Sequence, residues 1–222
     1  MNADITFAPP PSMNYRYIAI EGNIGAGKTT LATMLAAHYN ARLVLEEFAD
    51  NTFLPKFYAE PERYAFPLEL SFLADRYKQL KSLLTVPDMF QQMVVADYVF
   101  TKSKLFARTN LKEDEYELFQ KFFDIINQHL PQPDLLIYLH APIQRLQHNI
   151  ANRGRSYEQA IPDEYLDKVQ HTYQQYLKQG VSKTLIIDMD EADFISNPLH
   201  FEHLVAFLEK DYDFTTHYFS LG

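Results

Sequence analysis

The stretch Ile20-Glu21-Gly22-Asn23-Ile24-Gly25-Ala26-Gly27-Lys28-Thr29-Thr30, IEGNIGAGKTT, decides how the rest of the chain is interpreted. Its residues 22–29 fit the pattern G-x-x-x-x-G-K-[ST] and lie between a short apolar run and a segment with helical spacing. Glycines in this setting let backbone N–H groups converge on phosphate oxygens, and the start of the helix adds a partial positive charge. Lys28 is placed to reach the outer phosphates of a nucleoside triphosphate, and the Thr29 hydroxyl is placed to bind Mg²⁺.

The loop predicts a binding site for a nucleoside triphosphate but not the reaction, because switch proteins, motor ATPases and small-molecule kinases share it. The loop residues expected to bind ATP are Gly22, Asn23, Ile24, Gly25, Ala26, Gly27, Lys28, Thr29 and Thr30. The residues that decide the reaction must lie elsewhere in the chain.

Five apolar runs rich in β-branched residues predict strands at Tyr17–Ile20, Leu43–Phe48, Met93–Tyr98, Leu135–His140 and Thr184–Asp188. Helical patterns occupy Thr29–Tyr39, Pro67–Leu84, Lys102 onward to Leu130, Pro142–Asn152, Pro162–Gln179 and Leu199–Glu209. Continuous apolar strands that alternate with helices are typical of a parallel sheet covered on both faces, so the fold class is a three-layer α/β domain. One helical stripe is expected to be buried: Tyr116, Phe119, Phe122, Phe123, Ile126 and Leu130.

The bulk properties favour one globular domain. The chain has 222 residues and is 47% hydrophobic, which predicts a single domain over residues 15–222 after a flexible leader, residues 1–14. A net charge of −9 argues against binding to nucleic-acid polymers or anionic membranes. The chain has no cysteine and no apolar run long enough to span a bilayer, so we expect a soluble, cytoplasmic protein.

A second basic site is expected at Arg153-Gly154-Arg155, between the fourth and fifth predicted strands. Two arginines that flank a glycine form a compact charged clamp, which is suited to stabilising a phosphoryl group during transfer. A solvated surface turn is the alternative interpretation. The phosphate loop in the same chain favours a lid over the nucleotide.

The acceptor side of the reaction is expected after the second strand, at Glu46-Glu47. A carboxylate at the C-terminal edge of a parallel sheet can accept the proton of an attacking hydroxyl and contact Mg²⁺. Side chains alternate along a strand, so only one of the two should face the site. Farther on, one helical face offers stacking and hydrogen bonds to a nucleobase, and it consists of Glu69, Phe72, Leu73 and Arg76. The alternatives are two exposed acids and a core face with a surface ion pair.

On these segments the chain resembles the deoxynucleoside kinase family. The resemblance rests on IEGNIGAGKTTL, on LEEFADNTFLPKFY followed by ERYAFPLELSFLADRYKQL, and on RGRSYEQAIPDEYLDKV. They occur in the family's order and spacing and cover most of residues 15–180. The resemblance implies a P-loop NTPase fold with a five-stranded parallel sheet of order 2-3-1-4-5, usually in a homodimer. It also implies transfer of the γ-phosphoryl group of ATP, with Mg²⁺, to the 5′-hydroxyl of a deoxynucleoside.

The resemblance also assigns roles to individual residues. The catalytic group is Glu46, Lys28, Arg153 and Arg155, and the metal ligands are Thr29, Glu46 and Asp97. The late loop Asp190–Asn197 is expected to face the adenine, with Asp190 among the ATP-binding residues together with Arg153 and Arg155. The substrate-binding set is Glu46, Phe57, Tyr58, Tyr64, Glu69, Arg76, Asp97 and Glu158.

Three departures from the family pattern bear on activity. Ala96-Asp97-Tyr98 replaces an acid-Arg-Ser triplet, so Asp97 can serve as the acid only with a register shift of one, and no arginine follows. Glu69 replaces a glutamine; an ionised glutamate only accepts hydrogen bonds, which favours a base with an exocyclic amine, such as that of deoxyadenosine. Asn149 stands where some members have an arginine. One missing charge-stabilising donor can cost roughly 3–4 kcal/mol of barrier.

Two alternatives to the deoxynucleoside kinase follow from the same residues. A thymidylate-type monophosphate kinase is suggested by Asp75-Arg76-Tyr77, although this tripeptide lies inside a predicted helix. A non-catalytic nucleotide-binding subunit is suggested by the missing arginine. His140, Lys102 and Asp134 flank predicted strands, and we expect them to be surface or packing residues outside the site.

Overall fold

The computed structural model describes residues 14–47, 51–85, 93–180, 182–190, 192–210 and 215–220. The predicted leader, apart from Asn14, lies outside these residues, as does Phe48 at the end of the predicted second strand. The elements are β1 Tyr17–Gly22, α1 Lys28–Tyr39, β2 Arg42–Val44, α2 Leu54–Ala59, α3 Pro61–Thr85, β3 Val94–Ala96, α4 Lys102–Asn110, α5 Glu113–Asn127, β4 Leu135–His140, α6 Ile143–Arg153, α7 Asp163–Leu177, β5 Thr184–Asp188, α8 Pro198–Leu208 and β6 Thr216–Phe219.

The sheet is parallel throughout, with the order β2-β3-β1-β4-β5-β6. The prediction of a parallel sheet is confirmed, but the predicted count of five strands is wrong because the described residues form a sheet of six. The additional strand β6 pairs with β5 at the edge, and its residues are half-buried or exposed in alternation. An edge strand of this kind has no continuous apolar run, so the pattern that predicted the central strands does not apply to it.

The second strand ends earlier than predicted because Asp97 intervenes. The backbone N–H of Asp97 donates to the carbonyl of Val44 at 3.1 Å, and Asp97 Oδ1 accepts the N–H of Glu46 at 2.7 Å. A side chain therefore replaces the next backbone partner, and residues 45–47 leave the ladder. This exit turns Glu46 from a strand position into the space above the sheet edge.

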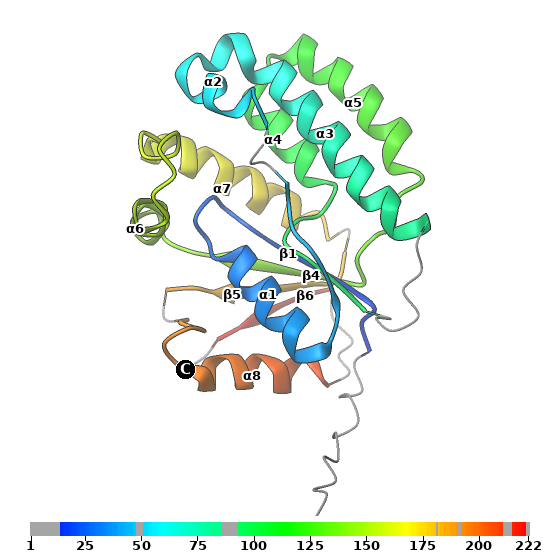
Figure 1. Cartoon of the computed structure of the whole chain (residues 1–222), viewed down its shortest axis with the longest axis vertical. Helices are drawn as coiled ribbons and strands as arrows, with labels where there is room; N and C mark the ends of the chain where they lie inside the picture. Colours follow the sequence, from blue (N-terminus) through cyan, green and yellow to red (C-terminus); the bar gives the residue numbers. More distant parts are fainter. Residues whose placement is uncertain are drawn as a thin grey trace, which may run out of the picture.

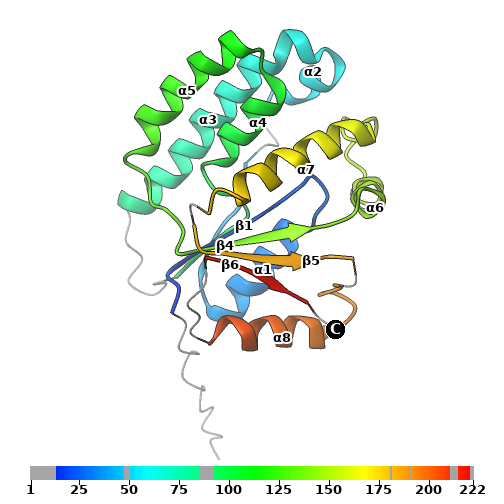
Figure 2. The same ribbon diagram turned by 180° about the vertical axis from the view of Figure 1, so that it is seen from behind.

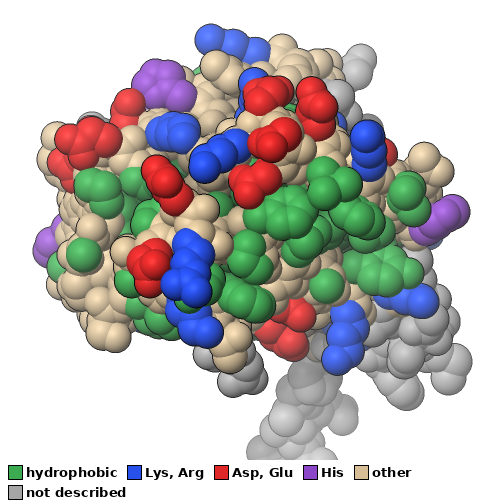
Figure 3. Space-filling model, turned by 90° about the horizontal axis from the view of Figure 1, so that it is seen from above, with side chains coloured by type: hydrophobic (Ala, Val, Ile, Leu, Met, Phe, Trp, Pro, Cys, Tyr) green, Lys and Arg blue, Asp and Glu red, His purple; other side chains and the backbone are tan. Residues whose placement is uncertain are grey.

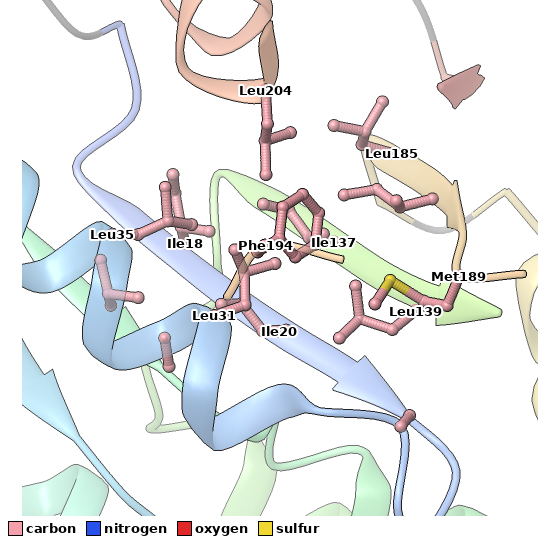
Figure 4. Packing of buried hydrophobic residues seen from close by; sticks show 14 of the residues in the cluster. Ile18, Ile20, Leu31, Leu35, Ile137, Leu139, Leu185, Met189, Phe194 and Leu204 are labelled. Atoms are coloured by element: carbon pink, nitrogen blue, oxygen red, sulfur yellow. The ribbon is translucent and has the colours of Figure 1, made fainter. Parts of the chain in front are cut away.

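Helices cover both faces of the sheet (Figure 1). Helices α1 and α8 lie on one face, and α3, α4, α5 and α7 lie on the other, which the view from behind also shows (Figure 2). The predicted three-layer α/β arrangement is confirmed. Alternate residues of β1 account for it. Ile18 and Ile20 pack with Leu31 and Leu35 of α1 (Figure 4). Tyr17 and Ala19 belong to the cluster on the opposite face.

The predicted aromatic stripe of α5 is only partly buried. Phe119 and Phe123 are buried and Phe100 stacks on Phe123, but Phe122 is 44% exposed. Phe122 lies about 100° around the helix from Phe123, so the two cannot share one narrow face. No helix within the described ranges is long and apolar enough to cross a bilayer.

Candidate active site

The phosphate loop joins β1 to α1 and can be formed only by glycines at two of its positions. Gly25 has φ +82°, and a Cβ there would lie 2.7 Å from the carbonyl oxygen of Leu146 in α6. Gly22 has φ +155°, and a Cβ there would lie 2.8 Å from the carbonyl oxygen of Leu139 in β4. The loop is therefore pressed against β4 and α6, which holds its shape before any phosphate binds.

The side chain of Lys28 folds back onto the phosphate loop. Its Nζ donates to the carbonyls of Gly22 at 3.0 Å and Asn23 at 2.8 Å. Burial lowers the pKa of Lys28 to about 8, and the nearby charge of Lys102 contributes in the same direction. Asn23 plays a structural part, because its amide donates to the carbonyl of Leu166 in α7 at 2.8 Å.

A cavity of about 640 Å³ opens at the C-terminal edge of the sheet. The predicted site residues that line it are Ile24, Gly25, Ala26, Gly27, Lys28, Thr29, Thr30, Glu46, Phe57, Tyr58, Glu69, Arg76, Asp97, Arg153, Arg155 and Glu158. Four predicted residues do not line it, namely Gly22, Asn23, Tyr64 and Asp190. Residues that the sequence reasoning did not place in the site include Leu54, Leu68, Lys102, Phe106, Asn110, Arg145 and Tyr165.

Glu46 is held by two cations. Arg76 of α3 donates from Nε at 2.9 Å and from Nη2 at 2.5 Å to Oε1 of Glu46, and Lys102 Nζ donates to Oε2 at 2.5 Å. Burial alone raises the pKa of this carboxyl, but Lys102 and Arg76 outweigh that effect and hold the pKa well below its usual range. Glu47 is exposed, so one of the two acids faces the cavity, as the strand-end pattern predicts.

The expectation for Lys102 is wrong. It is 5% exposed, lines the cavity and begins α4, whereas a surface or packing role was expected. The next residue, Ser103, accepts a hydrogen bond from Arg76 Nη1 at 2.7 Å, so the first turn of α4 holds both cations around Glu46. Asp134 is a packing residue as expected, with Oδ2 accepting the N–H groups of Arg16 and Tyr17.

Asp97 and Tyr98 point in different directions after β3. The hydroxyl of Thr29 donates to Oδ2 of Asp97 at 2.5 Å, which brings two of the predicted metal ligands together. Tyr98 is buried in the core below the site, and its hydroxyl donates to Gln79 at 2.9 Å. The position where an arginine was expected therefore faces the core in this chain.

The hydroxyl–carboxylate pair fits Mg²⁺, because this cation prefers hard oxygen ligands and takes its remaining ligands from phosphate and water. In the described part of the chain no cluster of three or more acidic, His or Cys side chains could hold a metal alone. Glu46 suits the role less than predicted, because both of its oxygens already face cations.

Glu69 lines the cavity from α3 and is 1% exposed. Its Oε1 accepts a hydrogen bond from Asn110 Nδ2 at 2.7 Å, whereas Oε2 has no hydrogen-bond partner among the described residues. Burial raises the pKa of Glu69 to about 7. Tyr64 was predicted to bind the substrate but does not line the cavity, and the cationic groups of Lys56 and Arg63 stand over its ring.

The lid arginines share one partner. Both Arg153 and Arg155 form ion pairs with Glu158, the latter at 3.1 Å, and Glu158 is 5% exposed. Gly154 between them ends α6 in the left-handed region at φ 71°, which turns the chain back over the cavity. The three predicted lid residues therefore meet at the cavity wall.

The late loop is organised by Arg145, which the sequence reasoning missed. Its guanidinium donates to the carbonyls of Met189, Asp190 and Ala192, at 2.9 Å for Asp190 and 2.5 Å for Ala192. Asp190 therefore contributes its backbone, while its side chain is exposed and away from the cavity, contrary to prediction. Arg145 contacts backbone carbonyls, which every residue has, so no pattern in the sequence indicates this role of Arg145.

The family of the chain follows from its similarity to known proteins. A family model described as deoxynucleoside kinase matches residues 18–211. The chain belongs to the deoxynucleoside kinase family. The protein is thus a phosphotransferase that uses ATP to phosphorylate deoxynucleosides.

Individual relatives of this deoxynucleoside kinase agree with the assignment. The chain is 37% identical over 202 residues to a deoxyguanosine kinase of Bacillus subtilis, covering 87% of this chain and 96% of the relative. It is 29% identical over 206 residues to a deoxyadenosine kinase of Dictyostelium discoideum, covering 91% and 81%. The solved structure of deoxyadenosine kinase from M. mycoides with bound dATP superposes with a TM-score of 0.75 at 23% identity, covering 87% of this chain and 100% of that one, which supports the fold.

Proposed function

We propose that this kinase transfers the γ-phosphoryl group of ATP to the 5′-hydroxyl of a purine deoxynucleoside and that Glu46 receives the hydroxyl proton. The observation that carries the proposal is that Lys28, Glu46 and the lid arginines line one cavity. A triphosphate on the loop and a nucleoside beside Glu46 would then meet inside it. Phosphoryl transfer requires the donor phosphate and the acceptor hydroxyl to lie close together, and residues for binding each of them line this cavity.

In the proposed step the 5′-oxygen forms a bond to the γ-phosphorus as the bond from phosphorus to the β–γ bridging oxygen breaks, and ADP leaves. The hydroxyl proton passes to the carboxylate of Glu46, which is ionised because Lys102 and Arg76 hold its pKa low. Such a carboxylate is a weak base, so its main contribution is to orient the hydroxyl in a loose transition state. Arg153 and Arg155 exchange their partner Glu158 for the phosphates as the lid closes.

Mg²⁺ is proposed to bind to the Thr29 hydroxyl and the Asp97 carboxylate together with the phosphates of ATP. When bound, it neutralises charge on the transferring phosphoryl group. The Thr29 hydroxyl donates to Asp97, and this contact keeps both oxygens in place for the metal.

The proposed base is a purine with an exocyclic amine. Oε2 of Glu69 has no hydrogen-bond partner within the described part of the chain, which favours a donor on the base, and Asn110 offers an amide beside it. Ionised Glu69 matches the N1–H and amino group of guanine, and protonated Glu69 matches the amino group and N1 of adenine. The two curated relatives described above are a deoxyguanosine and a deoxyadenosine kinase, which supports a purine.

The test is ADP release from ATP over a panel of deoxynucleosides and their monophosphates. Turnover is expected with purine deoxynucleosides, and Glu46→Gln is expected to abolish it while ATP binding persists. Turnover with monophosphates alone would instead establish the thymidylate-type alternative. Retained turnover in Glu46→Gln would remove Glu46 from its assigned role, and Glu47→Gln, the exposed neighbour, is the matched control.

The proposal includes a homodimer that forms through α5. Leu118, Phe122 and Ile125 of this helix are 44%, 44% and 66% exposed, and their spacing puts them on one face. Figure 3, which looks down on the end of the molecule built by α2, α3 and α5, shows hydrophobic side chains gathered on that surface. A second copy of the same face would cover them in a two-fold arrangement.

A further inference from the structure

Lys102 is a buried lysine whose ammonium group stands at the proposed reaction centre. It is 5% exposed, and its Nζ lies 2.5 Å from Oε2 of Glu46 and 5.6 Å from the ring centre of Phe106. A buried ammonium is costly unless a partner compensates for it. Glu46 is that partner, so the two groups form a fixed pair inside the cavity wall.

Counting acceptor positions shows where a substrate hydroxyl can bind. A carboxylate offers about four lone-pair positions, two on each oxygen. Arg76 fills two on Oε1 with Nε and Nη2, and Lys102 fills one on Oε2. Among the described residues these are the donors to Glu46, so the remaining position is on Oε2, directly beside the Lys102 ammonium.

The charge balance of the site leads to the same residue. The segment after β3 supplies Asp97 and the core residue Tyr98 in place of an arginine. Lys102 begins the next helix, and its N–H donates to the carbonyl of Val99 at 3.0 Å, which fixes the turn that carries it. The positive charge thus reaches Glu46 from α4, five residues after Asp97.

We propose that Lys102 is a positioning residue for phosphoryl transfer, which aims Oε2 of Glu46 at the nucleoside hydroxyl and supplies the positive charge that the segment after β3 lacks. This inference rests on the proposed function of Glu46. It also accounts for activity in a chain without the family's strand-3 arginine, which was the reason to consider a non-catalytic subunit.

The first experiment compares three variants at position 102 with a control on the same helix. Lys102→Met is expected to lower kcat about a hundredfold, the scale for loss of one preorganised charged donor. ATP affinity and the thermal midpoint are expected to change little. Lys102→Arg should recover most of kcat, and Lys102→Gln, which keeps a hydrogen bond without the charge, should recover little. Lys104→Met removes an α4 lysine that is 4.0 Å from Asp124 and should leave kcat unchanged.

A double-mutant cycle separates positioning from a purely structural role. Steady-state turnover of Glu46→Gln is expected to be lost, so the cycle is measured by single-turnover kinetics at high enzyme concentration. If Lys102 acts through Glu46, then Lys102→Met should have almost no further effect on the slow single-turnover rate of Glu46→Gln. An equal loss in both backgrounds, or a wild-type kcat in Lys102→Met, would overturn the inference while the wild-type turnover still supports the proposed function. If Lys102→Met does not fold, the comparison of Lys102→Arg with Lys102→Gln tests the inference. A kcat of Lys102→Gln equal to that of Lys102→Arg would also overturn the inference. Absence of wild-type turnover on every deoxynucleoside would reject the proposed function itself.

Discussion

At the scale of single residues, the site concentrates ionisable groups whose surroundings differ. Glu46 and Glu69 are both glutamates near Arg76, yet the pKa of Glu46 lies well below its usual range and burial raises that of Glu69 to about 7. The difference lies in the partners. Two cations contact Glu46 directly, whereas Glu69 receives one neutral amide and has an oxygen without a hydrogen-bond partner. One acid is therefore kept ionised, and the other can bind a proton near neutral pH.

Glu69→Gln is expected to stabilise the free enzyme in a pH-dependent way. The folded pKa of about 7 exceeds the ordinary value of 4.5, so the folded state binds more protons between these values and stability falls as the pH rises through them. Glutamine avoids this loss, so the variant should gain on the order of 2–3 kcal/mol at pH 8 and little at pH 4.5. Urea unfolding at both pH values measures it.

Glu47→Gln is the control for this measurement, because Glu47 is exposed and the same change at a solvated site should give no stability gain that depends on pH. An equal effect of Glu69→Gln at pH 4.5 and pH 8 would show that folding does not raise the pKa of Glu69.

At the scale of elements, the nucleotide site depends on helix α6. This helix presses on Gly25 of the phosphate loop, its Asn149 amide donates to the carbonyl of Gly25 at 2.8 Å, and Arg145 holds the late loop. Asn149 is the residue noted above as a departure from an arginine, and here it supports the loop. Because α6 also ends at the lid, one helix links three parts of the site.

Arg145→Ala is expected to loosen the late loop and weaken ATP binding about tenfold. A tenfold change in affinity corresponds to about 1.4 kcal/mol, and hydrogen bonds from a charged donor contribute at least this much. Hydrogen exchange at residues 192–197 should rise in the nucleotide-free enzyme. Arg145→Lys keeps the charge but not the fork that serves three carbonyls, so it should resemble alanine. Exchange rates equal to those of the wild type would contradict the role assigned to Arg145, and Arg108→Ala, an exposed arginine paired with Glu113, is the control.

At the scale of the whole molecule, the cavity and the proposed dimer surface lie on different parts of the fold. The cavity opens at one edge of the sheet, while the exposed apolar face of α5 belongs to the helical layer on one side of it (Figures 1 and 3). Contact between two copies through α5 would therefore leave the cavity open to nucleotides.

The dimer is tested by light scattering of the purified protein. The wild type is expected at twice 26.0 kDa, and the double variant Phe122→Glu, Ile125→Glu at 26.0 kDa, because burying two charges would cost more than the apolar contact gains. Leu199→Glu changes an equally apolar residue, 58% exposed on α8, and should remain dimeric. A monomeric wild type at micromolar concentration would refute the dimer.

Much of this protein follows from local sequence. The phosphate loop could be predicted because its glycines are required by φ values and close contacts that few other residues tolerate. Strands β4 and β5 have the predicted bounds because they are central and apolar along nearly their whole length. Glu46 could be predicted because a carboxylate at a strand end of a parallel sheet reaches the ligand edge.

The remainder depends on contacts between segments far apart in the chain. Strand β6 forms because it pairs with β5. Lys102 joins the site because a turn brings α4 against Glu46. Arg145 holds the late loop through backbone carbonyls, which any sequence would offer. The sequence by itself determined the phosphate-binding loop, the order of apolar strands and the acid at the sheet edge, because these depend on steric and hydrophobic patterns of neighbouring residues. Only the tertiary structure decided which cations surround that acid, because burial and ion pairing are properties of the packed chain.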